Sequence, residues 1–424
     1  MFKKISKISL LTSVLLLSAC NNTSSSNTGS SNKTESPVNK STDTTSSTTN
    51  VDTANNAKES APSTSSTTST DGNTVTRSVK DEPYYRYLWH IDSANSKALG
   101  ISNEVSAALN GIYKVDAVDK NADINVLEAW KISKGKNVIV AVIDDGADVY
   151  HEDLKDNIYK TYNADDGSTD VSNPSSQIST FSHGNTCAGF IVAPINGKGT
   201  IGTAPESKLI AIAQRETSDA NTIKAFEYAK NNGAKVISCS WGTEQVSQVI
   251  VDELKSLYNA GITVVFASGN NGKTLDTAGL NDESEVEWVI GIGASGENND
   301  VTPYSNYGQN IDILAPGGDA SLSVGILGLD DTGVQGSTEN YGLVSDDYSF
   351  GAGTSFATPV IAGVIALMYS VNPKITPAQV KEILIDTADK IGGNKAYYRD
   401  GFDQKRAYGK VSAYKALLEV QKLL

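Results

Sequence analysis

The chain has 424 residues, a formal net charge of −14 at pH 7 and only three cysteines. The negative charge argues against nucleic acid or an anionic membrane surface as a partner of the folded part, since both attract clustered Lys and Arg. With so few cysteines, a framework of disulfides is not expected.

The first 19 residues have the pattern of a bacterial export signal. Three lysines at positions 3, 4 and 7 precede an apolar run over residues 8–17, which is short for a membrane span. The run ends at Leu17-Ser-Ala-Cys20, which resembles a lipobox, so Cys20 is the expected site of lipidation. An ordinary signal peptide cleaved elsewhere is the alternative. We expect export across the cytoplasmic membrane and a lipid anchor in the cell envelope.

Residues 20–80 are dominated by Ser, Thr and Asn, and no aromatic residue occurs between positions 21 and 83. Such a segment cannot bury enough apolar surface to offset the entropy of ordering its backbone. We therefore expect a disordered tether. Residues 81–424 have the composition of one large α/β domain.

Five continuous apolar runs rich in β-branched residues predict strands buried on both faces of a parallel sheet. They cover residues 137–143, 209–213, 235–239, 263–267 and 289–292. Helical patterns cover residues 220–231, 246–260, 357–369 and 378–388. Alternating strands and helices predict an α/β fold with a central, mainly parallel sheet and helices on both faces. Pro359 is expected in the first helical turn, which places Ser355 at the N-terminus of that helix.

Three segments supply an acid, a base and a nucleophile in the order Asp, His, Ser. Asp144 ends a buried strand, His183 precedes Gly184 and a small-residue helix start, and Ser355 enters a buried helix. A serine hydroxyl needs a neighbouring base to act as a nucleophile, and a carboxylate can fix the histidine tautomer. Taken singly, they could be a turn aspartate, a structural histidine and an N-cap serine. Their conjunction favours catalysis.

Asn270 follows the strand over residues 263–267 and could donate its amide to an oxyanion beside the Ser355 N–H. Alone, it would be a turn residue. Together these segments resemble the subtilisin-like serine peptidases, whose patterns are D-x-G, H-G-T-x-x-A-G, G-N and G-T-S-M-A-x-P. Here Asn185 replaces Thr and Phe356 replaces Met, which removes no catalytic atom.

The resemblance covers about residues 81–424 and implies a three-layer subtilisin-like fold. It also implies hydrolysis of polypeptide substrates through an acyl-enzyme, with the substrate extended along Ser240, Trp241 and Gly242. Cys187, one helical turn after His183, could make the enzyme sensitive to thiol reagents, although a small buried apolar role is the simpler interpretation.

Several details are more similar to the kexin/furin branch, among them Asp144-Asp145-Gly146, Cys187 and Ser238-Cys-Ser-Trp-Gly242. Cleavage after paired basic residues would need acidic groups in the substrate pockets. The candidates are Glu244, Asp276 and Asp282. Preference for basic or for apolar residues stays open at this point.

The resemblance also implies a structural Ca²⁺ site. Asp153 lies nine residues after Asp144, and Asn196 lies in the loop before Gly202-Thr-Ala-Pro205. Carbonyls of Pro194, Lys198 and Thr200 would complete the site, with Glu82 or Asp81 from the N-terminal arm. Oxygen ligands of these kinds suit Ca²⁺, although the same loop could be a Gly-rich surface turn.

Two other functions use the same features. The first is a catalytically silent surface protein that binds peptides on this fold, and the second is an adhesin whose tether is the functional part. We expect a monomer. Residues 21–80 are too polar for the folded propeptide that secreted subtilases usually carry. The alternatives are folding without help, use of residues 80–121, or a separate maturation helper.

Overall fold

The computed structural model describes residues 77–94, 118–172, 183–277, 281–319, 325–333, 344–393 and 397–424. The predicted signal segment, Cys20 and nearly all of the predicted tether lie outside the described residues.

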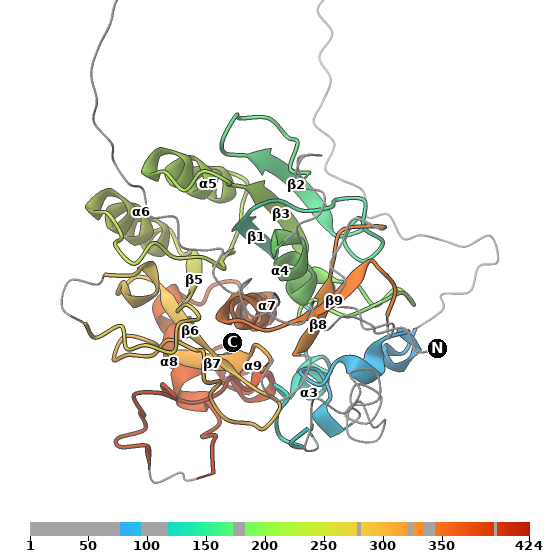
Figure 1. Cartoon of the computed structure of the whole chain (residues 1–424), viewed down its shortest axis with the longest axis vertical. Helices are drawn as coiled ribbons and strands as arrows, with labels where there is room; N and C mark the ends of the chain where they lie inside the picture. Colours follow the sequence, from blue (N-terminus) through green and yellow to red (C-terminus); the bar gives the residue numbers. More distant parts are fainter. Residues whose placement is uncertain are drawn as a thin grey trace, which may run out of the picture. The chain divides into compact units, whose positions relative to one another are not determined.

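A seven-stranded parallel sheet forms the centre of the described region, in the order β2-β3-β1-β4-β5-β6-β7 (Figure 1). Its strands are β1 (Ile139–Asp144), β2 (Ile158–Asn163), β3 (Lys208–Ala213), β4 (Val236–Cys239), β5 (Thr263–Ala267), β6 (Ile290–Ser295) and β7 (Ile313–Pro316). A second, two-stranded antiparallel sheet is formed by β8 (Ile326–Leu329) and β9 (Tyr348–Gly351). The predicted α/β class is therefore confirmed.

Helices cover both faces of the sheet. They are α3 (Val126–Ala129), α4 (His183–Val192), α5 (Asp219–Asn231), α6 (Gln248–Asn259), α7 (Thr354–Val371), α8 (Pro377–Thr387) and α9 (Ala413–Gln421). Short 3-10 turns occur at Val79–Asp81, Tyr85–Tyr87 and Glu283–Glu285.

Alternate residues of β1 enter two different hydrophobic cores. Ala141 and Ile143 pack with α5 and α6, whereas Val140 and Val142 pack with α4 and α7. This follows from the two-residue period of a strand, because neighbouring side chains point to opposite faces. A sheet buried on both faces needs apolar residues at nearly every position, which explains the continuous runs in the sequence.

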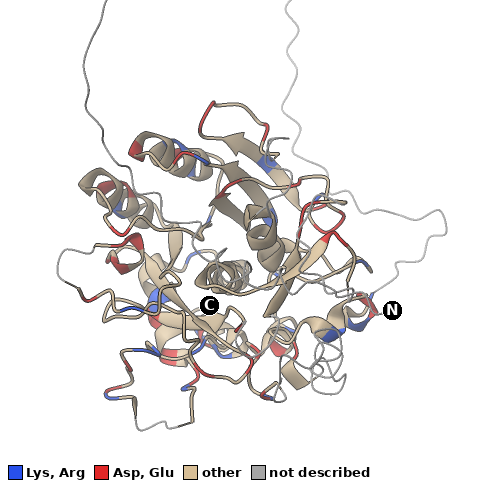
Figure 2. Ribbon diagram, viewed as in Figure 1, with Lys and Arg blue, Asp and Glu red and all other residues tan. Residues whose placement is uncertain are grey.

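Helix α7 runs through the larger core and contains no charged residue, and Figure 2 shows the charges mainly on outer helices and loops. It is long and apolar enough to cross a membrane, but most of it is buried inside the fold, as expected of a core helix. It begins at Thr354, earlier than predicted, so Pro359 is its sixth residue and not part of the first turn. The expectation that Pro359 lies in the first turn was therefore wrong.

Candidate active site

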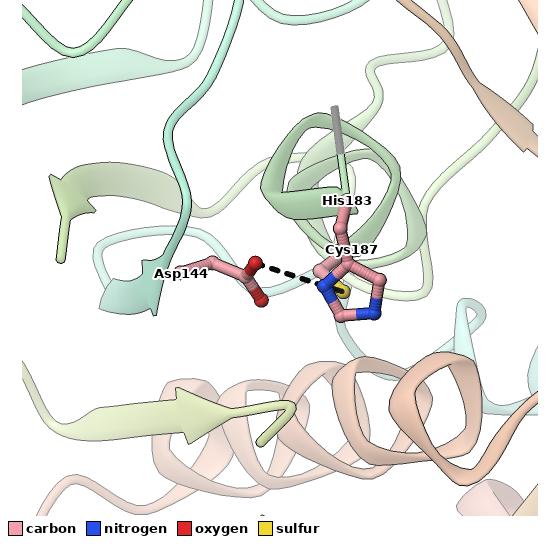
Figure 3. Close-up of side chains that lie close together, drawn as sticks. All are labelled: Asp144, His183 and Cys187. Atoms are coloured by element: carbon pink, nitrogen blue, oxygen red, sulfur yellow. Dashed lines mark hydrogen bonds and ion pairs between the residues drawn. The ribbon is translucent and has the colours of Figure 1, made fainter. Parts of the chain in front are cut away.

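The carboxyl end of β1 meets the start of α4, where Asp144 and His183 lie side by side (Figure 3). Asp144 Oδ1 is 2.8 Å from His183 Nδ1. Asp144 is buried, whereas the His183 side chain remains 27% exposed. Burial alone lowers the pKa of His183, but the charge of Asp144 and its hydrogen bond raise that pKa well above its ordinary value.

Asp145 attaches the start of α4 to the end of β1. Its carboxylate accepts hydrogen bonds from the backbone N–H of Gly184 at 2.8 Å and of His183 at 3.2 Å. These are two of the N–H groups that a helix start leaves without an intrahelical acceptor. Burial and the charge of Asp144 raise the pKa of Asp145 to about 6. The residue next to Asp144 thus positions the helix that carries His183.

Gly184 permits the close approach of these two elements. A Cβ at this position would lie 2.2 Å from the carbonyl oxygen of Gly146 and 2.9 Å from the Cβ of Asp144. Backbone atoms cannot give way as a flexible side chain can. The small residue after His183 is therefore required by the approach of α4 to β1.

Ser355 is the second residue of α7, whose N-cap residue Gly353 makes no side-chain cap. The Ser355 Oγ donates to the carbonyl of Ser240 at 3.0 Å, and the Ser355 N–H has no acceptor among the described residues. An uncapped helix start with an open N–H favours a negative charge beside it. The nucleophile candidate thus lies where an oxyanion can be held.

Thr354 fixes the orientation of the Asn270 amide. Asn270 Oδ1 accepts from the N–H and the hydroxyl of Thr354, at 2.8 and 2.9 Å. The amide nitrogen Nδ2 lies 3.5 Å from the point that a Cβ on Gly353 would occupy. With its oxygen held in this way, the amide presents its donor nitrogen at the same helix start.

Pro359 has no N–H to donate to the carbonyl of Ser355, four residues earlier. That carbonyl accepts instead from the hydroxyl of Ser240 at 2.7 Å and from the thiol of Cys187 at 3.4 Å. The proline therefore leaves an acceptor that two neighbouring elements satisfy. This ties α7 to β4 and α4 at the site, and it explains why a proline is tolerated in the second turn.

The predicted substrate segment Ser240, Trp241 and Gly242 follows β4 beside Ser355. Trp241 Nε1 donates to the carbonyl of Ile143 at 2.9 Å, and its ring packs edge-on against Phe266. The indole thus joins the segment to β1 and β5.

The three acidic pocket candidates are placed differently. Asp282 is buried, and its Oδ2 lies 2.7 Å from the point that a Cβ on Gly242 would occupy. Glu244 forms an ion pair of 2.7 Å with Lys273. Asp276 is exposed and accepts from Gln309 N and Gln404. Only Asp282 directly adjoins Gly242.

A second cluster surrounds Asp153, which is fully buried. Its carboxylate accepts from Asn196 Nδ2 at 3.0 Å, the Thr200 N–H at 2.8 Å and the Tyr348 hydroxyl at 3.0 Å. Glu82 is buried nearby: its Oε1 accepts from the Gly197 N–H at 2.8 Å, and its Oε2 has no partner in the part of the chain that the structure describes. Burial raises the pKa of both carboxyl groups, that of Asp153 to about 7.

This cluster suits a hard cation. Two buried carboxylates with an unpartnered oxygen lack compensating charge, which a cation would supply. The carbonyls of Pro194, Lys198 and Thr200 accept no hydrogen bond from the described residues. Asp81, the alternative to Glu82, is exposed and accepts from the Ser78 N–H instead. Glu82 is therefore the acidic residue of the arm that reaches the loop.

Residues 135–409 match the model of the subtilase family. The chain belongs to the subtilase family. This confirms the family predicted from the motifs.

Individual subtilases are similar over much of the chain. A calcium-dependent protease of Trichormus variabilis is 32% identical over 344 residues, covering 70% of this chain and 48% of the relative. Thermitase of Thermoactinomyces vulgaris is 29% identical over 299 residues, covering 69% of this chain and 93% of thermitase. The chain thus spans about half the length of the first of these relatives.

Solved structures show the same subtilase architecture. A protease of Pseudoalteromonas arctica superposes with a TM-score of 0.65 at 24% identity, covering 81% of this chain and all of the neighbour. At this identity the likeness concerns the fold alone.

Sequence reasoning did not assign roles to Asp145, Thr354 and Tyr348. Asp145 appeared only as part of a motif, and its adjacency to Asp144 was the available signal. Thr354 and Tyr348 act through contacts with Asn270 and Asp153, far from them in sequence. No local pattern reveals such pairs.

Proposed function

We propose that this subtilase is a serine endopeptidase that hydrolyses polypeptides through an acyl-enzyme, with Asp144, His183 and Ser355 as its triad. The observation that carries the proposal is the 2.8 Å contact of Asp144 Oδ1 with His183 Nδ1. Cys187 Sγ lies 3.8 Å from that nitrogen and 3.4 Å from the carbonyl oxygen of Ser355, which brings the uncapped start of α7 beside the pair. Family membership supports the same chemistry.

In the proposed mechanism Ser355 Oγ attacks the substrate carbonyl carbon, and His183 Nε2 takes its proton. The hydroxyl must then exchange its present bond to the Ser240 carbonyl for one to His183. Asp144 holds the Nδ1–H tautomer and stabilises the imidazolium. His183 returns the proton to the leaving amine, and water repeats the sequence on the acyl-enzyme.

Two donors hold the oxyanion of the tetrahedral intermediate in this mechanism. They are the open Ser355 N–H and Asn270 Nδ2, which both lie at the start of α7. The substrate would extend along Ser240–Gly242, pairing its backbone with this segment.

The decisive test is labelling with a fluorophosphonate, combined with hydrolysis of a casein-type substrate. Wild-type protein should be labelled and active, and Ser355→Ala should lose both properties. Ser370→Ala, at the other end of α7, is the matched control and should behave as wild type. A silent peptide-binding protein would give neither labelling nor hydrolysis in the wild type, which would contradict the proposal.

For specificity, we propose that Asp282 is the acidic group that a basic substrate side chain beside Gly242 would meet. Burial raises the pKa of Asp282, so a positive partner would relieve the cost of its charge. A fluorogenic panel with Arg, Leu or Phe before the scissile bond tests this kexin-like preference. Faster cleavage after Leu or Phe in the wild type would show an apolar pocket instead.

We further propose that Asp153, Asn196 and Glu82 bind a structural Ca²⁺, with carbonyls of Pro194, Lys198 and Thr200. The name of the Trichormus relative, a calcium-dependent protease, supports this. When bound, Ca²⁺ would neutralise the buried carboxylates and tie the N-terminal arm to the loop. At 100 times its Kd it would add about 3 kcal/mol to the free energy of unfolding.

Chelation should therefore lower the melting temperature of the wild type. Glu82→Gln keeps the acceptor for the Gly197 N–H but removes the charge, so its melting temperature should respond less to the chelator. A wild-type melting temperature that EGTA leaves unchanged would argue against the site.

Finally, we propose that the enzyme is exported and anchored in the cell envelope through lipidated Cys20. The apolar run and lipobox-like Leu17-Ser-Ala-Cys20 support this. Mass spectrometry of the mature N-terminus from membranes, compared with Cys20→Ser, is the test. An unmodified N-terminus beyond residue 20 in the wild type would contradict it.

A further inference from the structure

Cys187 brings a thiol to the pair formed by Asp144 and His183. Residues 183 and 187 lie one turn apart on α4, so both side chains face the same way. Cys187 Sγ is 3.8 Å from His183 Nδ1, and one ligand atom from each of the three residues lies within 4.8 Å of the others. Figure 3 shows the sulfur beside the imidazole ring, with the Asp144 carboxylate facing the same nitrogen.

These distances approach those of a metal-bound set. In a tetrahedral zinc site with Zn–S near 2.3 Å and Zn–N near 2.0 Å, sulfur and nitrogen lie about 3.5 Å apart. The observed separation of 3.8 Å is close to that value. The Asp144 carboxylate oxygen now lies 2.8 Å from His183 Nδ1. It would have to move away from that nitrogen by about 0.5 Å to occupy a ligand position of the same tetrahedron.

The second oxygen of Asp144 is also available. Asp144 Oδ2 is buried and has no hydrogen-bond partner among the described residues, while Oδ1 is shared by His183 and the Asp145 N–H. A buried carboxylate oxygen without a partner is costly, and a cation would remove that cost.

We propose that Asp144, His183 Nδ1 and Cys187 Sγ form an inhibitory site for a thiophilic divalent cation such as Zn²⁺. Binding forms Zn–O, Zn–N and Zn–S bonds, and the thiol and Nδ1 protons leave to solvent without any redox change. Ser355 O loses the Cys187 donor but keeps the hydroxyl of Ser240 at 2.7 Å.

Occupation of this site inactivates the proposed peptidase. A metal on Nδ1 replaces the proton that Asp144 holds there and draws electron density from the ring. His183 Nε2 then becomes a weaker base, and Asp144 can no longer stabilise the imidazolium. This consequence rests on the proposed function, whereas the binding itself does not.

The ligand types separate this site from the calcium cluster. Thiolate and imidazole select zinc-like ions, whereas carboxylates and carbonyls around Asp153 suit Ca²⁺. Cys187 is fully buried and His183 is partly exposed, so the ion enters by displacement of the imidazole. Inhibition should therefore develop with time of incubation.

The first arm of the test measures peptide hydrolysis after incubation with Zn²⁺ at constant excess Ca²⁺. Cys187→Ser keeps a small polar donor but loses the thiolate, so the inhibitory zinc concentration should rise at least about tenfold. Cys239→Ser changes the other described buried cysteine and should keep wild-type sensitivity. Equal zinc sensitivity of the wild type and Cys187→Ser would overturn the proposal.

The second arm reads binding without activity. Co²⁺ added to Ser355→Ala should give a near-ultraviolet thiolate-to-cobalt absorption, which Ser355→Ala combined with Cys187→Ser should lack. Cys187→Ala replaces the serine variant if the latter fails to fold. Absence of this absorption in Ser355→Ala overturns the metal site. A wild type that shows the absorption but hydrolyses no peptide overturns only the peptidase function.

Discussion

The two helices that carry His183 and Ser355 begin in opposite ways. The start of α4 is capped from outside by the Asp145 carboxylate, which accepts from two of its N–H groups. The start of α7 has no side-chain cap, and the Ser355 N–H is left without an acceptor among the described residues. In the proposed mechanism, one helix start positions the base His183, while the other stays open for developing negative charge.

The side chains beside the two helix starts differ in the same way. At α4 the acceptor is a fixed carboxylate, so the charge is part of the protein. At α7 the side-chain amide of Asn270 has its oxygen turned to Thr354, which leaves its nitrogen for a ligand. The following four changes test this contrast, in order of decreasing effect on activity.

Asn270→Ala removes the amide donor from the open helix start. We expect kcat to fall about 100- to 1000-fold with little change in KM, because the bond forms only in the transition state. That range was measured on subtilisin itself, a member of this family, so it is not an independent estimate. Asn271→Ala, the exposed neighbour, is the control in steady-state assays. A change confined to KM would mean that Asn270 stabilises the bound substrate and the transition state equally.

Asp145→Ala removes the cap of α4. Loss of an N-cap acceptor costs about 1–2 kcal/mol, which corresponds to about a 5- to 30-fold loss in kcat/KM if the energy is lost from the position of His183. Asp145→Asn retains one acceptor oxygen and should lose less. Denaturant unfolding and kinetics together check the prediction. Full activity in Asp145→Ala would show that β1 alone places His183.

Thr354→Val keeps the shape of the side chain but removes the hydroxyl that bonds Asn270 Oδ1 and accepts from the Gly269 N–H. The Thr354 N–H still holds the amide. The loss of about 1 kcal/mol should lower kcat about fivefold. Thr354→Ser should restore it. If both variants match the wild type, the backbone contact alone orients the amide.

His90→Phe tests the packing beneath both helices and should leave activity unchanged. His90 contacts Phe190 of α4, which contacts Phe356 of α7, with ring centroids 5.6 and 5.5 Å apart. Neither His90 nitrogen has a hydrogen-bond partner within the described ranges, and burial lowers the pKa of His90 to about 3.

The sign of the pH effect follows from this pKa. Below pH 6.5 His90 binds a proton in the unfolded state but not in the folded state. The free energy of unfolding therefore decreases as the pH falls, down to about pH 3. At pH 5 this loss is about 2 kcal/mol, and His90→Phe should recover it while changing little of the pH dependence above pH 7. Urea unfolding at pH 5 and pH 8 gives the comparison. An equal effect of the substitution at both pH values would point to packing alone.

The central strands could be predicted because each carries its own signal. The runs near residues 137–143, 209–213, 235–239, 263–267 and 289–292 match β1, β3, β4, β5 and β6 closely. Strand β2 lies at the sheet edge, and its pattern Ile158–Asn163 is partly exposed and polar, so it carries no such run. The short strands β7, β8 and β9 and the closing helix α9 were also not predicted.

The sequence by itself determined the family, the buried sheet and the identities of the candidate acid, base and nucleophile. These properties can be read from local patterns, because the order of apolar residues along the chain predicts burial and the motifs lie in short segments. Only the tertiary structure decided that Asp145 caps α4, that Thr354 holds the oxygen of Asn270, and that Glu82 reaches the loop at Gly197. It also decided that Cys187 joins the Asp–His pair. Such contacts depend on the relative placement of elements distant in sequence, which packing and close approach set and no local pattern encodes.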